Sequence, residues 1–450
     1  MRTERGHGVD SNGSAWGTLL PLVAWWSGLA VAVFLLVWLN DLRMFPRQAI
    51  IILLLAGGVY AGACFWLHRR WPGWDPPTRQ RALAVIFVGA ILVRVFLLAV
   101  PPSLSDDIYR YRWDGRVQAA KLNPYSEPPA SASLAPLRDP LWERINYCNI
   151  RTIYPPLTEW LFALAYRIHP DLISFQVLAI VGDLLVVILL LACLQQWKLP
   201  LWRVALYAWS PLAAVEAASN AHFDSWPIAA VLLSVYMLLR SASARSTLAL
   251  TVGILLKTWP IVLVPLFLRR RPRWHLLLMA GVIAGAYLPF ASAGAGLLQP
   301  WLDFTGRWLF NDAGFAVLRF VSRSQPLAKG LAAVLGLTLL QALWKRGVDS
   351  LQGSYWLLQA AILLMPAIQP WYLLWPLPLA AVSLDLGWIL LTLLAPLAYW
   401  ILVGAGPDSN LWVEPIWVRF VLYLPPLAIW VRQLLTHRLP TLPARPQEAS

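Results

Sequence analysis

Residues 172–194 read LISFQVLAIVGDLLVVILLLACL, and Asp183 is the only charged side chain in this stretch. About 20 consecutive apolar residues in an α-helix cross a hydrocarbon core that is about 30 Å thick. The stretch therefore predicts a membrane-spanning helix that carries one carboxylate inside it.

Apolar runs of this kind recur along the whole chain of 450 residues. Hydrophobic residues make up 59% of it and charged residues 13%, against about 45–50% and about 25% in soluble globular proteins. We expect spans at about residues 18–39, 49–67, 82–101, 155–168, 172–194, 203–218, 225–240, 247–268, 274–292, 327–344, 353–368, 371–384, 386–403 and 416–435. The pattern excludes a soluble enzyme and predicts an all-α, polytopic integral membrane protein, a single domain over residues 1–450 with about 12–14 transmembrane helices.

The positive charge of the chain predicts its topology. The net charge is +14, and arginines gather in the short connections 68–81 and 269–273. Because short cytoplasmic loops are rich in Lys and Arg, we expect both termini in the cytoplasm and the long connections 103–153 and 293–326 outside the cell membrane. The 27 tryptophans fit interfacial belts, so the expected surface partners are membrane lipids and not nucleic acid.

The connection 103–153 opens with the sequence SDDIYRYRWDG, residues 105–115. Ser105 suits the N-cap of a helix whose first turn would hold Asp106 and Asp107, where the helix dipole stabilises negative charge. One interpretation is a helix on the bilayer surface with ion pairs along one face and an apolar stripe along the other. The pairs would join Asp106, Arg110 and Asp114, and the stripe would consist of Tyr109, Trp113, Val117 and Ala120.

The other interpretation of this segment is catalytic. Adjacent carboxylates, Asp106 and Asp107, supply a general base, and Arg110 and Arg112 lie about one turn away as anion binders. The chain has neither a G-x-G-x-x-G nor a D-x-D sequence, so a soluble sugar nucleotide and its metal are not indicated. We therefore expect a donor from the lipid phase and no required cofactor, while assistance by a divalent cation stays open.

These motifs resemble a known family. The segments SDDIYRY (105–111), WDG (113–115), NPY (123–125) and TIYPP (152–156) are similar to the first outer loop of GT-C glycosyltransferases that use polyprenyl-phosphate mannose. Weaker similarities follow at NAHFD (220–224), KTWP (257–260), WLFN (308–311) and PWYLLW (370–375). The resemblance covers about residues 80–400, although two more predicted spans than usual precede the acidic loop.

The resemblance implies a transferase with an extracytoplasmic catalytic loop. It would pass a hexose, by resemblance mannose, with inversion from a polyprenyl-phosphate sugar to a hydroxyl of a glycan, lipid or protein acceptor. The family's acidic pair corresponds to Asp106 and Asp107, one of which is expected to be the base. Its tyrosine and asparagine positions correspond to Tyr109, Asn123 and Tyr125.

Further candidate substrate-binding residues are Arg110, Arg112, Asp114, Arg151, Tyr154, His222, Asp224 and Lys257. Lys257 lies in the apolar run 247–268, where a charge at the bilayer centre costs about 2.5–3.5 kcal/mol. It would bind the donor phosphate, reach an interface, or pair with Asp183 or Glu216. Because Pro260 removes a backbone donor, we also expect an interruption of the helix there.

The other polar candidates have structural interpretations as well. His222 and Asp224 would orient a sugar or the acceptor, or would only cap a span. Arg151 would bind phosphate or anchor its segment at the membrane interface. Arg94 and Asp183, both inside apolar runs, are expected to form internal pairs.

A different class of function stays open at this point. In a transporter or flippase of lipid-linked sugars, the buried charges Arg94, Asp183, Glu216 and Lys257 would line a pathway. A non-catalytic membrane scaffold is a third reading. The acidic pair lies in a loop and not in the middle of a span, which favours the enzyme.

Overall fold

The computed structural model describes residues 11–297, 299, 309–404 and 414–444. Across these ranges the chain is helical, and its only β-type pairing is a single bridge between Phe310 and Ala367. The predicted all-α class is confirmed. Trp308, which belongs to one of the weaker motifs, lies outside the described residues.

The α-helices are interspersed with 3-10 helices (η). In chain order they are α1(Ser11–Leu39), α2(Pro46–Arg70), η1(Trp71–Gly73), α3(Pro76–Leu97), α4(Asp107–Ala119), η2(Ala132–Leu137), η3(Pro140–Arg144), α5(Pro156–Ile168), α6(Leu172–Gln196), η4(Leu201–Val204), α7(Ala205–Ala208), α8(Pro211–Ala218), α9(Ser225–Leu239), α10(Ser243–Leu256), η5(Trp259–Leu263), α11(Val264–Phe267), α12(Trp274–Tyr287), η6(Leu288–Leu297), α14(Gly314–Ser322), α15(Gln325–Lys345), α16(Ser350–Leu363), η7(Pro370–Leu374), α17(Leu377–Ser383), α18(Leu386–Leu394), η8(Ala395–Trp400), α19(Ile401–Gly404) and α20(Ile416–Leu435).

Eight helical stretches in the described ranges have the length and hydropathy to cross a membrane. They are Gly17–Leu39, Pro46–Gly73, Pro76–Leu97, Leu172–Gln196, Trp274–Leu297, Gln325–Lys345, Leu386–Val403 and Ile416–Leu435. The polytopic character is confirmed. The other predicted spans form shorter or interrupted helices, such as the 13 residues of α5 and the 15 residues of α9. Eight full-length spans therefore stand in the described part of the chain, where about 12–14 spans were expected.

The predicted interruption at Lys257 is confirmed. Helix α10 ends at Leu256, Lys257 is extended with φ −158° and ψ 141°, and η5 starts at Trp259 with Pro260 in its first turn. The carbonyl of Leu256, left free by the break, accepts a hydrogen bond from the hydroxyl of Thr158 in α5. The break thus places Lys257 at a helix end that is tied to α5.

The first three helices pack closely because one of them presents a glycine. The indole of Trp26 in α1 donates to the carbonyl of Gly89 in α3 at 3.1 Å. A Cβ at Gly89 would lie 2.5 Å from the Trp26 ring, so no larger residue fits there without moving α1. Helix α3 itself starts at Pro76, and the carboxylate of Asp75 caps it by accepting from the Thr78 amide at 3.1 Å.

Arg94 and Asp183 form the internal pair that the sequence predicts. The Arg94 Nε contacts Asp183 Oδ2, and the two side chains are 0% and 1% exposed. Tyr207 donates to Asp183 Oδ1 at 2.9 Å, while Arg94 Nη1 donates to the carbonyls of Ala90 and Ala208 at 3.0 and 2.8 Å. This cluster joins α3, α6 and α7.

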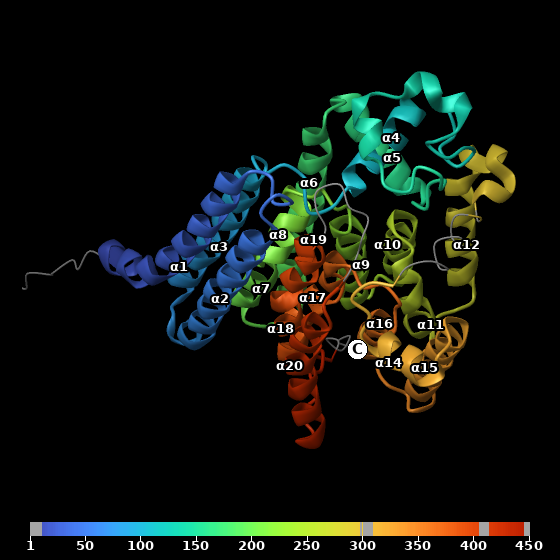
Figure 1. Cartoon of the computed structure of the whole chain (residues 1–450). Coiled ribbons are helices and arrows are strands. Elements are labelled where there is room, and N and C mark those ends of the chain that lie inside the picture. Colours follow the sequence, from blue (N-terminus) through green and yellow to red (C-terminus); the bar gives the residue numbers. More distant parts are fainter. Residues whose placement is uncertain (1–10, 298, 300–308, 405–413, 445–450) are drawn as a thin grey trace, which may run out of the picture.

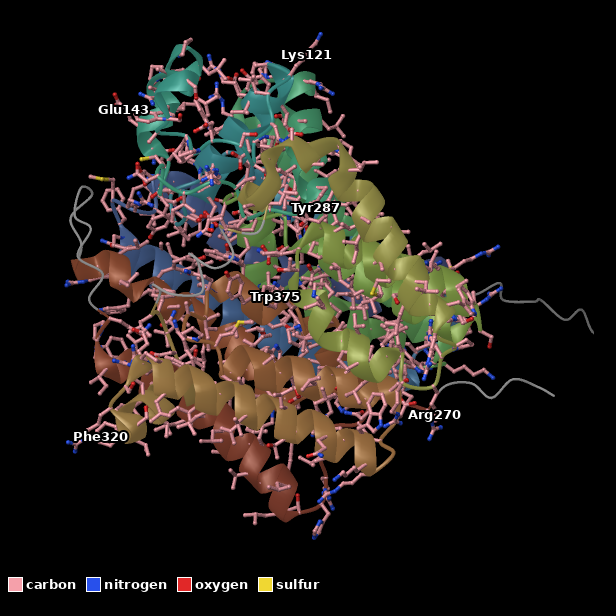
Figure 2. The ribbon with its side chains drawn as sticks, turned by 90° about the vertical axis from the view of Figure 1, so that its right-hand side faces the viewer. Lys121, Glu143, Arg270, Tyr287, Phe320 and Trp375 are labelled. Carbon is pink, nitrogen blue, oxygen red and sulfur yellow. The ribbon has the colours of Figure 1, made fainter. Side chains whose placement is uncertain are left out.

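Figure 1 shows how the helices are arranged around the site. Helices α1, α2 and α3 stand together on one side, and α17, α18 and α20 lie in the middle. Helices α4 and α5, with the residues between them (107–168), form a layer at one end, called the loop layer below. Figure 2 places Lys121 and Glu143 of the loop layer at one end, Trp375 in the interior, and Arg270 toward the other end. The arginine-rich connection is thus remote from the acidic loop.

Candidate active site

The acidic pair lies where the chain leaves α3 and enters α4. Helix α4 starts at Asp107, and Asp106 takes the N-cap position, so the predicted N-cap at Ser105 is wrong. Asp106 points to a connection that precedes α2, where the guanidinium of Arg43 donates to Oδ2 at 2.9 Å. Arg144 is 3.9 Å from its other oxygen. The predicted pair of Asp106 with Arg110 is therefore wrong, because a neighbouring connection supplies a closer cation.

Asp107 points away from that connection toward the loop between α8 and α9. Its Oδ2 lies 3.7 Å from Nε2 of His222, a distance that makes the contact an ion pair and not a hydrogen bond. Its Oδ1 accepts from the Asn146 amide at 3.3 Å. The Asp107 side chain keeps 26% of its surface exposed, so the carboxylate is held by protein and still accessible.

His222 is buried between a carboxylate and an indole. Its Nδ1 lies 2.7 Å from Oε2 of Glu216, and both side chains are 1% exposed. The ring of Trp371 stacks on the imidazole with the centroids 3.7 Å apart and the planes inclined by 23°. The imidazole consequently has one fixed orientation, with Nε2 directed toward Asp107.

Lys257 pairs with Asp224. Its ammonium is 2.6 and 2.7 Å from the two carboxylate oxygens, and the Trp375 indole also donates to Asp224, at 2.6 Å. The alternative pairing of Lys257 with Asp183 or Glu216 is wrong, because Asp183 binds Arg94 and Glu216 binds His222. The ammonium also lies 5.4 Å from the Tyr372 ring centroid, and its side chain is 22% exposed.

Charge and burial set the ionisation of the two groups that face each other. Burial by itself lowers the pKa of His222, but its contacts with Asp107 and Glu216 raise that pKa to about 9. Burial by itself raises the pKa of Asp107, and here His222, the Asn146 amide and the charge of Lys257 lower it. At neutral pH the site therefore holds an ionised Asp107 beside a protonated His222.

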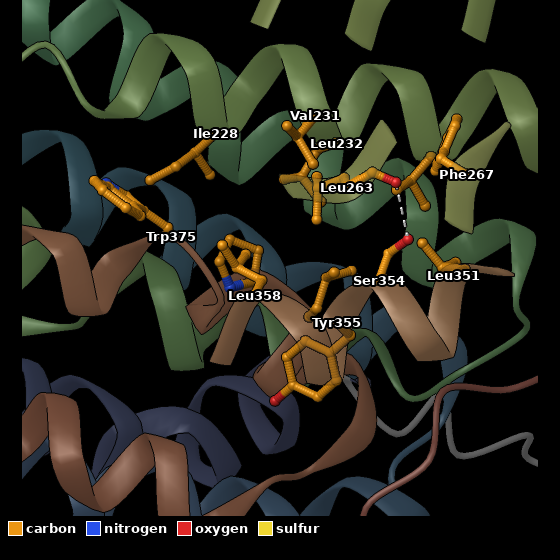
Figure 3. A pocket seen from close by; sticks show the side chains of 13 residues that line it. Ile228, Val231, Leu232, Leu263, Phe267, Leu351, Ser354, Tyr355, Leu358 and Trp375 are labelled. Atoms are coloured by element: carbon orange, nitrogen blue, oxygen red, sulfur yellow. Dashed lines mark hydrogen bonds between the residues drawn. The ribbon is translucent and has the colours of Figure 1, made fainter. Parts of the chain in front are cut away.

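An apolar pocket adjoins this site at Trp375 (Figure 3). Its lining includes Ile228, Leu263, Phe267, Leu351, Tyr355 and Leu358, and none of its side chains is charged. Trp375 is common to the pocket and to the Asp224–Lys257 pair. Asp107, His222, Asp224 and Lys257 do not line the pocket, so the acid–base chemistry belongs to the polar cluster beside it.

The arrangement suits removal of a proton from a substrate beside a group that can bind an anion. An ionised and accessible carboxylate accepts a proton, and Lys257 supplies positive charge close to it. Among the described residues no group of three or more His, Cys, Asp and Glu side chains is placed to hold a metal ion. We assign no metal ligands here.

Known proteins with similar sequences identify the family. Residues 12–269, more than half of the chain, match the model of a family described as alpha-(1->6)-mannopyranosyltransferase, N-terminal domain. The chain belongs to this mannosyltransferase family. The alpha-(1->6)-mannopyranosyltransferase A of Mycobacterium tuberculosis is 24% identical over 390 residues, which cover 74% of this chain and 70% of that protein. No solved structure matches the chain.

The match confirms the resemblance that the motifs indicate. The matched residues include Asp107, His222, Asp224 and Lys257 of the mannosyltransferase, and they end before η7, which contains Trp371 and is followed directly by Trp375. The site is thus assembled from the part of the chain that matches the family model and from the part that follows it.

Most other predicted site residues hold the loop layer of the mannosyltransferase together. Arg110 donates to Asp114 at 2.9 Å, Arg112 lies 2.8 Å from Asp139, and Arg144 lies over the Tyr109 ring. The Arg110–Asp114 ion pair expected along one face of this helix is confirmed, but because Arg110, Arg112 and Asp114 are all buried, the interpretation of α4 as a helix that only lies on the bilayer surface is wrong. Burial raises the pKa of Asp114, although Arg110 opposes the shift.

The remaining predicted residues join this layer to η6. Asn123 donates to the Phe290 carbonyl at 3.0 Å and to the Ser292 hydroxyl at 2.9 Å. Tyr125 donates to the Tyr154 carbonyl at 2.5 Å, and Arg151 donates to the carbonyl of Ser126 at 2.9 Å. No contact joins Asn123, Tyr125 or Arg151 to Asp107 in the described part of the chain, whereas Tyr154 lies close enough for the Asp107 charge to raise the pKa of its hydroxyl, together with burial.

Several residues of the site were not predicted as such. Glu216 was expected only as a partner for Lys257 or as a charge lining a transport pathway, and Asn146 carries no local signal because it lies in an irregular part of the loop. Trp371 and Trp375 belong to a quoted motif, but their partners come from distant segments. The available sequence signal for Glu216 was an acidic residue inside the apolar run 203–218, four residues before the sequence Asn-Ala-His.

Proposed function

We propose that the protein transfers mannose, with inversion, from polyprenyl-phosphate mannose to a hydroxyl of a glycan acceptor at the outer face of the cell membrane. The observation that carries this proposal is the accessible Asp107 carboxylate, which contacts His222 and lies within range of the Lys257 charge. The family and the mycobacterial relative support mannosyl transfer. The eight candidate spans and the lack of a nucleotide-binding sequence support a donor carried by lipid.

The proposed reaction is a single displacement. Asp107 takes the proton of the acceptor hydroxyl while the hydroxyl oxygen attacks C1 of the mannosyl group. The bond from C1 to the phosphate oxygen breaks, and polyprenyl phosphate leaves with its electron pair. Lys257 stabilises the negative charge that develops on the phosphate. An α-linked product made with inversion requires a β-linked donor, so the configuration of donor and product tests the mechanism.

The outer location rests on the order of the spans. Three candidate spans, in α1, α2 and α3, precede the acidic loop, so an N-terminus in the cytoplasm puts the loop outside. The arginine-rich connection around Arg270 lies toward the opposite end of the molecule from Glu143 (Figure 2). Both observations support the side that the positive charges predict.

Cysteine labelling on intact cells tests the location. In a background with Cys64, Cys148 and Cys193 replaced by serine, Ser133→Cys should react with an impermeant maleimide. Arg270→Cys is the matched control and should react only after lysis. The reverse pattern would refute the outer location.

A transfer assay in detergent tests the donor. Purified protein, freed of lipid carriers, receives a mannan oligosaccharide and either radiolabelled polyprenyl-phosphate mannose or GDP-mannose. We expect label in the oligosaccharide only from the lipid-linked donor, with α linkages from a β donor. Transfer from GDP-mannose would refute the donor assignment. Translocation across sealed vesicles without transfer in detergent would instead establish a flippase, but the candidate pathway charges Arg94, Asp183, Glu216 and Lys257 are divided between separate ion pairs.

A further inference from the structure

Glu216, at the end of α8, is one of the most completely bonded carboxylates in the described part of the chain. Its Oε1 accepts from the hydroxyl of Tyr399 in η8. Its Oε2 accepts from the Asn220 amide at 3.0 Å and contacts Nδ1 of His222 at 2.7 Å. Because its side chain is 1% exposed, Glu216 cannot touch a substrate directly.

The backbone reinforces the link between Glu216 and His222. The His222 amide donates to the Glu216 carbonyl at 2.8 Å. Between them Ala221 has φ 56°, in the left-handed region, which makes the tight turn that folds the imidazole back onto the carboxylate. Trp371 covers one face of the ring. The ring therefore presents Nε2 to Asp107, 3.7 Å away, and Nε2 has no hydrogen-bond partner of its own.

We propose that Glu216 is a positioning residue that acts through His222 on Asp107, keeping that carboxylate oriented and ionised to serve as the base. The inference rests on the proposed transferase function and adds a residue to it. Glu216 accepts the Nδ1 proton, so the ring is held with its second N–H toward Asp107. An imidazolium in that place favours the charged form of the carboxylate.

Other charged and titratable groups around the pair have partners of their own. Asp224 and Lys257 bind each other, and Asp106 binds Arg43. Tyr399 donates to Glu216, and the Asn146 amide donates to Asp107. Tyr372 lies over Lys257. Glu216 is thus the group whose removal changes the charge of His222 most directly.

The sign of the expected pH effect follows from this chain of contacts. Loss of the Glu216 charge lowers the pKa of His222, so the imidazole loses its proton at lower pH and no longer favours the charged form of Asp107 there. The alkaline limb of kcat/KM should therefore move to lower pH, because the imidazolium that orients the base is lost earlier. A role of Glu216 in folding alone would leave that limb in place.

The test compares Glu216→Gln with Asp385→Asn. Asp385 is also a buried carboxylate with a tyrosine partner, accepting from Tyr355 at 2.9 Å, but it contacts Gln359, Trp388 and Trp430 and no histidine. In transfer assays on folded, detergent-purified protein, Glu216→Gln should reduce kcat by about tenfold or more and move the alkaline limb downward by about one pH unit. Asp385→Asn should lower thermal stability and leave both pH limbs unchanged.

A second measurement does not depend on turnover. Nitrogen NMR of labelled histidine, with the His222 signal assigned by its loss in His222→Gln, should show that His222 titrates at lower pH in Glu216→Gln than in the wild type. An unmoved His222 titration or an unmoved alkaline limb in active Glu216→Gln would overturn the inference. Lack of transfer by the wild type would refute the proposed function, a result distinguishable from these. Should Glu216→Gln not fold, Glu216→Asp keeps the charge but withdraws it by one methylene, and an undiminished kcat in that variant would also overturn the inference.

Discussion

Two of the buried charge clusters in the described part of the chain differ in accessibility. In the first, Arg94 and Asp183 are 0% and 1% exposed and bind each other, Tyr207 and two backbone carbonyls. In the second, His222 is equally buried, but Asp107 and Lys257 keep 26% and 22% of their side chains exposed.

The difference separates a structural ion pair from a site. Charges taken out of water are costly, so a closed pair that binds only protein groups serves to join helices. Carboxylates and cations that share a site and remain accessible are arranged for a ligand. The shifted pKa values of Asp107 and His222 are typical of such a site. The contrast predicts opposite phenotypes for equally conservative substitutions in the two clusters.

The largest effect is expected at the open cluster. Asp107→Asn should lower transfer about 10²–10⁴-fold, the usual contribution of a general base, while the protein still folds. Steady-state transfer in detergent, with size-exclusion elution as the folding control, checks this. Activity within about threefold of the wild type would remove Asp107 from the role of base.

The closed cluster should respond in stability. Arg94→Met leaves a buried carboxylate without its cation and should cost about 3–5 kcal/mol of unfolding free energy. Arg94→Met combined with Asp183→Asn should recover much of that loss, with normal turnover for each folded molecule. Thermal unfolding in detergent measures both. A folded double variant without transfer would contradict the division into two clusters.

Lys257 tests how open the second cluster is. Lys257→Met should raise the donor KM about 10–100-fold, because a hydrogen bond to a charged group contributes about 1.5–3 kcal/mol. The internal pair with Asp224 complicates the single variant, so Lys257→Met with Asp224→Asn is the companion. A raised donor KM in the folded double variant supports phosphate binding, whereas a normal KM leaves Lys257 only its internal role.

The protonation of His222 predicts a pH-dependent contribution to stability. Its pKa of about 9 lies above the ordinary 6.5, so the contribution is complete below about pH 6.5 and is lost as the pH rises through about 9. The difference in Tm between the wild type and His222→Gln should therefore be greatest near about pH 6 and should shrink toward about pH 10. A difference that does not vary with pH would mean that His222 is neutral.

The smallest effect is expected at Asp106. Its ion pair with Arg43 is partly exposed, and such pairs contribute up to about 1 kcal/mol, which corresponds to about fivefold in rate. Asp106→Asn should therefore keep at least about a fifth of the transfer activity. A loss as large as that expected for Asp107→Asn would mean that the two carboxylates act together.

The sequence predicts the fold class and the helix interruption better than the partners of the ion pairs. Long apolar runs indicate spans because the bilayer sets a minimum helix length, and Pro260 indicates an interruption because it lacks a backbone donor. The partner of Lys257 depends on how α10 is rotated against α9, which packing of distant helices decides. The expected partners were Asp183 and Glu216, acidic residues that lie inside other apolar runs, and the structure supplies Asp224.

The same limit applies to the acidic pair. The adjacent aspartates are visible in the sequence, but the different contacts that each of them makes are not. Asp106 binds Arg43 of an earlier connection, and Asp107 contacts His222 of a later one. Only the fold shows that consecutive residues point toward different segments.

The hydrogen bond from Thr158 to the Leu256 carbonyl links the two halves of the site mechanically. Thr158 belongs to α5, which packs against α4, the helix that starts at Asp107. The carbonyl that it holds directly precedes Lys257. A displacement of α4 and α5 would therefore be transmitted to the backbone beside Lys257, which couples the proposed base and the proposed cation mechanically.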